Sequence, residues 1–145
     1  MKKTIITLFT IIFIVVTIIC VNYYSYMDEY KSIRTKNEKF EQYKNKEIYG
    51  IELGTLINKV IDQNTKNKIE EDEKNVFIPN EENSIQIEIY MTDNEQTYKM
   101  ETFYNSGMTN FIKYYGDVKF KCSKIEYHQK TKLVKYLLFE QIQSS

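Results

Sequence analysis

Residues 1–21 read MKKTIITLFTIIFIVVTIICV, and this stretch decides how the N-terminal part of the chain folds. Lys2 and Lys3 precede an apolar run, Thr4 to Val21, that contains no charged residue and no proline. At a rise of 1.5 Å per residue, these 18 residues reach ~27 Å as a helix, close to the ~30 Å hydrocarbon thickness of a bilayer. We therefore predict a membrane anchor over 1–21 with a short cytoplasmic tail, and the lipid bilayer as the partner of Thr4 to Val21.

Three fates are compatible with two lysines followed by an apolar run: a cleaved signal peptide, a lipoprotein signal that ends at Cys20, and a retained anchor. Signal cleavage needs small residues in an A-x-A-like pattern, whereas this run ends TIICV and the chain contains no alanine. Acylation of Cys20 needs a small residue before it, and Ile19 is large and β-branched. We interpret the run as a retained single-pass anchor.

The residues after the run favour an interfacial position. Tyr23, Tyr24 and Tyr26 stand where amphipathic aromatic rings prefer the lipid headgroups. Basic residues, which usually remain on the cytoplasmic side, occur on both sides of the run: Lys2, Lys3, Lys31, Arg34, Lys36 and Lys39. A short positive tail ahead of the run is the usual form of a signal anchor, so we expect the N-terminus inside and the domain outside the cell membrane.

The composition argues for one further domain without a basic excess. The 145 residues carry no formal net charge, which argues against nucleic acid as a partner because phosphate binding needs a basic excess or face. Cys20 in the membrane and Cys122 in the domain cannot form a disulfide across that geometry. We expect Cys122 to be a buried small hydrophobic residue, with a lone thiol as the alternative.

Apolar spacing predicts two helices before the second half of the chain. A stripe from Tyr23 to Phe40 predicts that the anchor helix continues to about Tyr43, and a coiled-coil dimer along this stripe is an alternative. A second stripe predicts an amphipathic helix over 51–64; it consists of Leu53, Leu56, Ile57, Val60 and Ile61. The predicted organisation is the anchor over 1–21, a helical extension or linker over 22–47, and a single α+β domain over 48–145.

Alternation of apolar and polar residues predicts strands in that domain. The stretch 85–91 alternates, a turn follows, and 97–103 alternates again, which predicts a hairpin. Helical spacing over 108–115 predicts a short helix, and 117–127 predicts a strand with a bulge near Ser123 and Lys124. The last strand, 133–142, is apolar on both faces, which favours a central position covered on both sides. The predicted fold class is α+β: a long N-terminal helix, a second amphipathic helix, and an antiparallel four-stranded ββαββ sheet.

Residues typical of catalytic or metal sites are scarce. His128 is the only histidine, and we interpret it as a surface residue of a turn. Histidine and cysteine are too few for a zinc site, and the four glycines form none of the familiar phosphate loops. Two carboxylate pairs, Glu81 with Glu82 and Glu126 with Glu140, have no visible apolar pocket, so we place them on the surface. The sequence therefore assigns no catalytic residue, no cofactor, no cofactor-binding residue and no metal ligand, and we expect no enzyme.

One stretch is similar to a calcium-binding loop. Asp62, Asn64, Ile69 and Glu73 fall at positions 1, 3, 8 and 12 of an EF-hand loop, directly after a predicted helix. Lys66 takes position 5, where an oxygen ligand belongs, and would place an ammonium group against a cation. We therefore interpret the stretch as a solvated acidic loop.

Two sets of short motifs carry a resemblance to known proteins. The stretches YG at 49–50 with LINKVID at 56–62, and FKC at 120–122 with IEYH at 125–128, resemble small, N-terminally anchored, uncharacterised membrane proteins of low-GC Gram-positive bacteria. This resemblance implies no activity, ligand or catalytic residue.

A membrane helix that continues into an amphipathic half and packs on a sheet is also similar in architecture to type IV pilins and pseudopilins. Pilins carry a glycine cleavage site before the apolar run and a glutamate five residues into it, and neither occurs between Met1 and Val21.

Together these features favour a non-enzymatic single-pass membrane protein that presents a small α+β interaction domain at the cell envelope. The alternative is a pilin-like or pseudopilin-like subunit of an envelope or secretion assembly. A third hypothesis is a lipid-anchored extracytoplasmic enzyme or ligand binder, for which the sequence offers no catalytic constellation.

Overall fold

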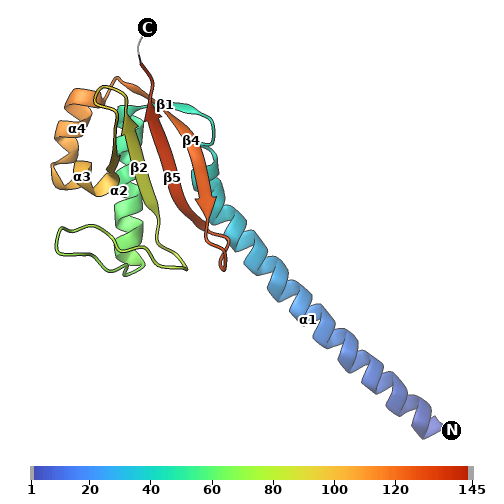
Figure 1. Ribbon diagram of the computed structural model, residues 1–145. Coiled ribbons are helices and arrows are strands. Elements are labelled where there is room, and N and C mark those ends of the chain that lie inside the picture. The colour runs from blue at the N-terminus through green and yellow to red at the C-terminus, as the bar shows by residue number, and fades with distance from the viewer. Residues whose placement is uncertain (1, 144–145) are drawn as a thin grey trace. The chain divides into compact units, whose positions relative to one another are not determined.

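The computed structural model describes residues 2–143, and the chain divides into two compact units, Met1–Lys36 and Asn37–Ser145 (Figure 1). The elements in chain order are α1 (Lys2–Glu41), β1 (Glu47–Tyr49), α2 (Gly50–Lys66), β2 (Gln86–Met91), β3 (Gln96–Lys99), α3 (Met100–Asn105), α4 (Met108–Tyr115), β4 (Lys119–Tyr127) and β5 (Val134–Gln141). The predicted α+β class with a long N-terminal helix is confirmed.

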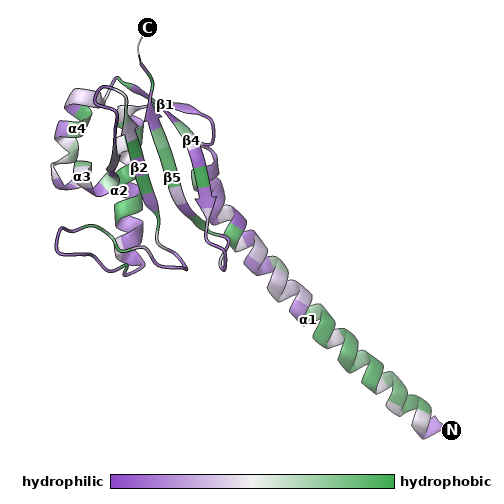
Figure 2. Ribbon diagram, in the orientation of Figure 1, coloured by the Kyte–Doolittle hydropathy of each residue, from purple (hydrophilic) through white to green (hydrophobic). Residues whose placement is uncertain are grey.

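Helix α1 is continuous from Lys2 to Glu41, so its predicted end near Tyr43 is correct within two residues. Its sequence contains neither glycine nor proline, the two residues that interrupt helices most strongly. The hydroxyl groups of Thr7, Thr10 and Thr17 each donate to the carbonyl four residues earlier, at 2.8–3.0 Å. The polar groups of these threonines are thus satisfied within the helix, and Figure 2 shows that its first half is almost wholly apolar.

A five-stranded sheet organises the C-terminal unit, in the order β1-β4-β5-β2-β3. Neighbouring strands are antiparallel except β2 and β5, which run parallel with Ile87 opposite Leu137 and Ile89 opposite Phe139. The predicted four-stranded antiparallel ββαββ sheet is therefore wrong in detail. The β4–β5 hairpin places β5 beside β2, inside the sheet, and the side-chain alternation of a strand carries no information about which strand it will pair with. Strand β1, only three residues long, escaped prediction.

The second predicted hairpin strand ends early. Strand β3 stops at Lys99, and residues 100–105 form helix α3 instead of continuing the strand to 103. Met100 is fully buried, and the ring of Phe103 lies 4.8 Å from that of Phe111 in α4 and 5.6 Å from that of Tyr98. This aromatic packing between consecutive elements outweighs the local alternation. The helix over 108–115 is confirmed, and so is the bulge in β4, where the register shifts between Cys122 and Lys124.

Helices α2, α3 and α4 cover one face of the sheet (Figure 1). The predicted α2 stripe is confirmed, because Leu53, Ile57 and Val60 are fully buried in one cluster with the inward side chains of the strands. Each such aliphatic side chain contributes ~1.5–3 kcal/mol of hydrophobic free energy. Phe40 and Tyr43, at the end of α1 and just after it, also belong to this cluster.

The other face of the sheet remains partly open. Strand β5 is central, as predicted, but its two faces differ: Leu137 and Phe139 are fully buried, whereas Leu138 is half-buried and Glu140 is exposed. The expectation that β5 is covered on both sides is therefore wrong. On the second face no layer of the described residues covers the strand, and Leu138 is half-buried by neighbouring side chains of the sheet.

Candidate functional site

The apolar run of α1 is exposed over its whole length. The accessible fraction of its large side chains ranges from 49% for Val15 to 72% for Phe13. Among the described residues, α1 is the one helix that is long and apolar enough to cross a membrane. A helix of this kind is compatible with a single-pass anchor or with a signal sequence.

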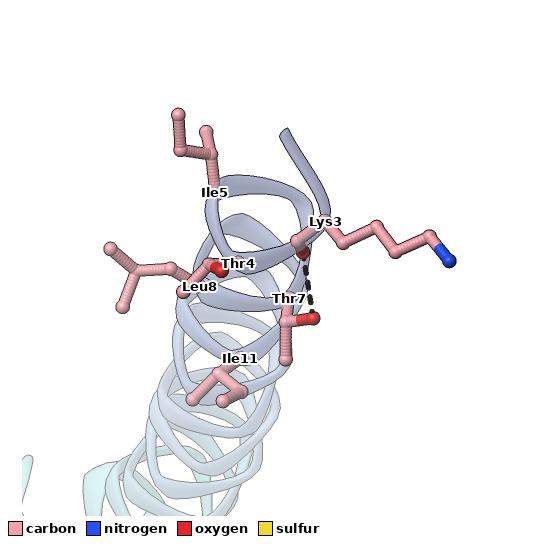
Figure 3. A pocket seen from close by; sticks show the side chains of 6 residues that line it. All are labelled: Lys3, Thr4, Ile5, Thr7, Leu8 and Ile11. Atoms are coloured by element: carbon pink, nitrogen blue, oxygen red, sulfur yellow. Dashed lines mark hydrogen bonds between the residues drawn. The ribbon is translucent and has the colours of Figure 1, made fainter. Parts of the chain in front are cut away.

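The first turns of α1 show how this surface is built (Figure 3). Ile5, Leu8 and Ile11 project outward, and the hollow among the side chains here is lined by α1 alone, with no opposing wall. The hydroxyl of Thr7 turns back to the carbonyl of Lys3, so it adds no free polar group to the surface. This hollow is apolar surface rather than a ligand pocket.

The two cysteines lie in different environments. Cys20 is exposed on the apolar run, and Cys122 is fully buried in β4, as predicted for a small hydrophobic residue. Burial raises the pKa of the Cys122 thiol to about 11, and its Sγ lies 3.7 Å from the carbonyl of Lys124. Cys122 is therefore a packing residue and not an activated nucleophile.

His128 follows β4 directly, but the prediction that it is a surface residue is wrong. Only 3% of its surface is accessible. Its Nε2 lies 2.8 Å from the carbonyl oxygen of Ser84, and because a carbonyl oxygen only accepts, Nε2 carries the proton. The backbone N–H of His128 donates to the carbonyl of Leu133 at 2.8 Å and closes the turn. The burial of His128 depends on a loop that lies 44 positions earlier in the sequence, so local spacing gives no sign of it.

The side chain of His128 borders a polar cavity of about 450 Å³, which we call the His128 cavity. Its lining consists of Pro79, Asn80, Glu81, Ser84, Gln86, Glu126, His128, Gln129, Lys135 and Tyr136. Three of these, Gln86, Tyr136 and Glu126, lie opposite one another across β2, β5 and β4. One row of side chains at the end of the sheet thus joins two loops in a single site.

Hydrogen bonds fix the loop of residues 79–84 on one side of the cavity. The Asn80 side-chain oxygen accepts the backbone N–H groups of 82–84 at 2.9–3.0 Å. The Ser84 hydroxyl accepts the N–H of Asn80 at 2.9 Å. The facing turn is tied to this loop by Lys130, which pairs with the Glu82 carboxylate at 2.8 Å, and by Thr131, which donates to the Glu82 carbonyl at 2.6 Å.

Charges beside the cavity are held in a network. Lys124 and Lys135 contact the two carboxylate oxygens of Glu126 at 2.6 and 3.1 Å, and these hydrogen bonds hold the pKa of Glu126 below its usual range. The Tyr136 hydroxyl donates to Glu88 at 2.7 Å. Burial and this carboxylate raise the pKa of Tyr136 above its ordinary value. Both partners of Glu126 are therefore engaged before any ligand arrives.

Other side chains of the lining are not engaged. Glu81, Gln86 and Gln129 make no side-chain hydrogen bond or ion pair with any part of the chain that the structure describes. They offer one carboxylate and two amide groups to whatever fills the cavity. These unengaged groups are suited to binding a polar solute. His128 and Ser84 already have partners, because His128 contacts a backbone carbonyl and the hydroxyl of Ser84 is bonded to Asn80.

The carboxylates singled out in the sequence have separate roles. Glu81 and Glu82 are exposed but border the same loop, where Glu81 lines the cavity and Glu82 ties the loop to the turn. Glu126 is half-buried at the cavity, while Glu140 is exposed on the open face of the sheet, opposite Lys121 in register.

The EF-hand-like residues do not converge. Asp62 pairs with Lys66 at 2.5 Å on the surface of α2, whereas Asn64 is fully buried and bonded to the backbone of Ile85. Within residues 2–143, no three histidine, cysteine or carboxylate side chains are grouped so that they could hold a metal ion.

Sequence reasoning missed the His128 cavity because its parts are distant in the chain. The signal that was present is the prediction of two consecutive strands, 117–127 and 133–142, in an antiparallel sheet with a turn at His128 between them; their pairing brings Glu126 across from Tyr136. The position of the loop at 79–84 could not be inferred. Comparison of the chain with models of protein families, with curated proteins and with solved structures gives no match.

Proposed function

We propose that this chain is a single-pass membrane protein whose α+β domain is a non-enzymatic interaction module at the outer face of the cell membrane. The observation that carries the proposal is the run Thr4 to Val21, in which every side chain is exposed. Water would penalise this surface by ~25 cal/mol for each Å² of apolar area, whereas a bilayer would not.

A retained anchor accounts for more features than a cleaved signal does. Helix α1 continues for 20 residues beyond Val21 without a break. Signal peptidase requires an accessible segment with small residues, and the corresponding stretch here is helical and carries large side chains. Tyr23, Tyr24 and Tyr26 are each 60–68% exposed, as suits rings at the level of the headgroups.

An interaction role is supported by what the domain leaves uncovered. The open sheet face and the His128 cavity offer fixed polar groups, while the buried thiol and the hydrogen-bonded histidine favour no nucleophilic chemistry. A pilin-like subunit is the second candidate, because Phe40 at the end of the long helix and Tyr43 just after it are buried in the core of the sheet domain.

Membrane fractionation tests the anchor. The full chain should stay in the membrane pellet at alkaline pH and be released by detergent. Replacing Ile12 and Val15 together by lysine costs ~2.5–3.5 kcal/mol per residue at the centre of a span, so this variant should move to the soluble fraction. The matched control, Glu71→Lys with Glu73→Lys, adds the same side chains in an exposed loop and should stay in the membrane.

Recovery of the wild-type chain in the soluble fraction would contradict the anchor. Mass spectrometry of the mature N-terminus separates the remaining readings: a start at Met1 or Lys2 supports the anchor, whereas loss of the apolar run identifies a cleaved signal. A processed, methylated or acylated start would favour the pilin-like or lipoprotein alternative.

A further inference from the structure

We propose that the His128 cavity binds a small organic ligand that carries a primary ammonium group. A volume of about 450 Å³ lies within the range of small-molecule sites, ~300–1,000 Å³. Most of the lining is polar, which favours a ligand that makes hydrogen bonds over one that fills an apolar slot.

The cavity is formed before a ligand arrives. Three interactions join its two loops: His128 to Ser84, Lys130 to Glu82, and Thr131 to the Glu82 carbonyl. Between them, the in-register row of Gln86, Tyr136 and Glu126 is fixed by backbone pairing of three strands. Binding therefore needs no rearrangement of the backbone and orders only the unengaged side chains of the lining, which limits its entropic cost.

The unengaged groups of the cavity are mainly acceptors. His128 Nε2 is committed to the Ser84 carbonyl, and Nδ1 has no hydrogen-bond partner among the residues described, so Nδ1 can accept a hydrogen bond when it carries no proton. The Glu81 carboxylate is likewise unpaired. An ammonium group supplies three N–H donors and a positive charge, which matches a carboxylate, an imidazole nitrogen and an amide oxygen.

Charge decides between an ammonium ligand and an anion. Lys135 is the one cation of the lining, and Glu126 already engages it together with Lys124. Glu81 is therefore the charged side chain of the lining that has no ion-pair partner among the residues described. An anion would meet this carboxylate without a free lysine to offset it, whereas a primary amine would neutralise it.

The test is a titration of the full-length protein in detergent micelles, followed by NMR of the backbone amides and of the His128 ring nitrogens. Ethanolamine should give saturable shifts confined to residues 79–86 and 126–136, with a Kd on the order of 1 mM. Choline has the same charge without N–H donors, and ethylene glycol has no charge; both should bind at least about tenfold more weakly.

Two variants make the test specific for this cavity. Glu81→Gln should weaken ethanolamine binding about tenfold, since it removes the charge of a charge-assisted hydrogen bond. Glu73→Gln is the matched control: this glutamate is also exposed, but it lies in the loop after α2, does not line the cavity and takes no part in joining its two loops, so binding should be unchanged.

Free amines and lipid headgroups share this chemistry, and reconstitution separates them. If ethanolamine binds equally in phosphatidylcholine vesicles with and without phosphatidylethanolamine, the ligand is a soluble amine; competition by phosphatidylethanolamine assigns the site to the headgroup. The proposal is overturned if no saturable shift occurs up to about 20 mM, if choline binds as well as ethanolamine, or if Glu81→Gln has no effect.

Discussion

The side chain of Asn64 and the backbone of Ile85 are joined by two hydrogen bonds. Asn64 Nδ2 donates to the Ile85 carbonyl at 2.8 Å, and the Ile85 N–H donates to Asn64 Oδ1 at 2.9 Å. Asn64 is fully buried, so a side chain of α2 acts as a strand partner for the residue that precedes β2. Asn37 makes the same pair of contacts with Lys132 and Val134 at the start of β5.

Replacing Asn64 by alanine should destabilise the domain by about 3 kcal/mol, because a buried N–H and a buried carbonyl lose their partners together. Chemical denaturation of the full chain in micelles, followed by near-UV circular dichroism, measures this loss. Asn58→Ala, at an exposed position of the same helix, should change stability by less than about 0.5 kcal/mol. An equal effect of the two substitutions would show that the Asn64 contacts contribute nothing specific.

Gly50 marks a close backbone approach that a side chain would obstruct. A Cβ atom there would lie 1.9 Å from the carbonyl oxygen of Tyr115, and the N–H of Gly50 donates to Val118 at 2.8 Å. Gly50→Ala should therefore cost at least ~2 kcal/mol, since backbone must move. In Gly54→Ala, in the same helix, the nearest atom to the new Cβ is the flexible end of Met108 at 3.1 Å, and no backbone atom is among the nearest neighbours, so thermal unfolding should separate the two variants clearly. A neutral Gly50→Ala would refute the close approach.

Glu101 should make stability depend on pH. It is 3% exposed and accepts the N–H of Phe77 at 3.3 Å, and burial raises the pKa of its carboxyl above the ordinary 4.5. A raised pKa in the folded state means that its stabilising contribution is complete below pH 4.5 and is lost as pH rises through the folded pKa.

Glu101→Gln removes this titration and keeps an oxygen for Phe77. The stability of the variant relative to wild type should therefore increase as pH is raised from about 4 to 8, measured by urea denaturation at each pH. Glu73→Gln in the exposed loop controls for loss of a charge and should show a flat difference. A flat profile for Glu101→Gln would mean that the carboxyl titrates alike in the folded and unfolded chain.

The thiol of Cys122 should react slowly in the folded protein. At a pKa of about 11 instead of 9.0, its thiolate fraction at pH 8 is lower by about 100-fold, and the side chain is fully buried as well. In a Cys20→Ser background, iodoacetamide should modify Cys122 only as fast as the domain opens. Glu73→Cys in the same background provides the exposed reference, and comparable rates for the two cysteines would contradict the burial.

The orientation expected from the N-terminal lysines places the domain outside the cell. A membrane-impermeant maleimide should therefore label Glu73→Cys, in the Cys20→Ser background, on intact cells. Lys3→Cys should become labelled only after the membrane is permeabilised. The reverse pattern would place the domain in the cytoplasm and leave the anchor itself unaffected.

Local patterns in the sequence were sufficient to predict the helices and strands that bury one regularly spaced apolar face. The stripe that includes Leu53 and Val60 and the alternation of Ile87 and Ile89 predicted α2 and β2, because each element buries one face against the same core. The pattern failed at Met100, where packing of Phe103 against Phe111 converts a strand into a helix.

Features that depend on long-range pairing were beyond local reasoning. The burial of His128 depends on its contact with Ser84, which the local sequence does not reveal. The burial of Asn64 depends in the same way on its contact with Ile85. The parallel pairing of β2 with β5 is of the same kind. These contacts join segments 21 to 48 positions apart, and no spacing rule connects them.

The place of β5 in the sheet decides when the sheet can be completed during synthesis. Among residues 2–143, β5 alone links the β1–β4 pair to the β2–β3 pair, and it follows the other four strands in the sequence. At ~5–20 residues per second, translation of the 113 residues between Val21 and Val134 takes about 6 to 23 s. During that interval the sheet lacks its centre, so the β1–β4 pair and the β2–β3 pair cannot be joined into one sheet until β5 has been made.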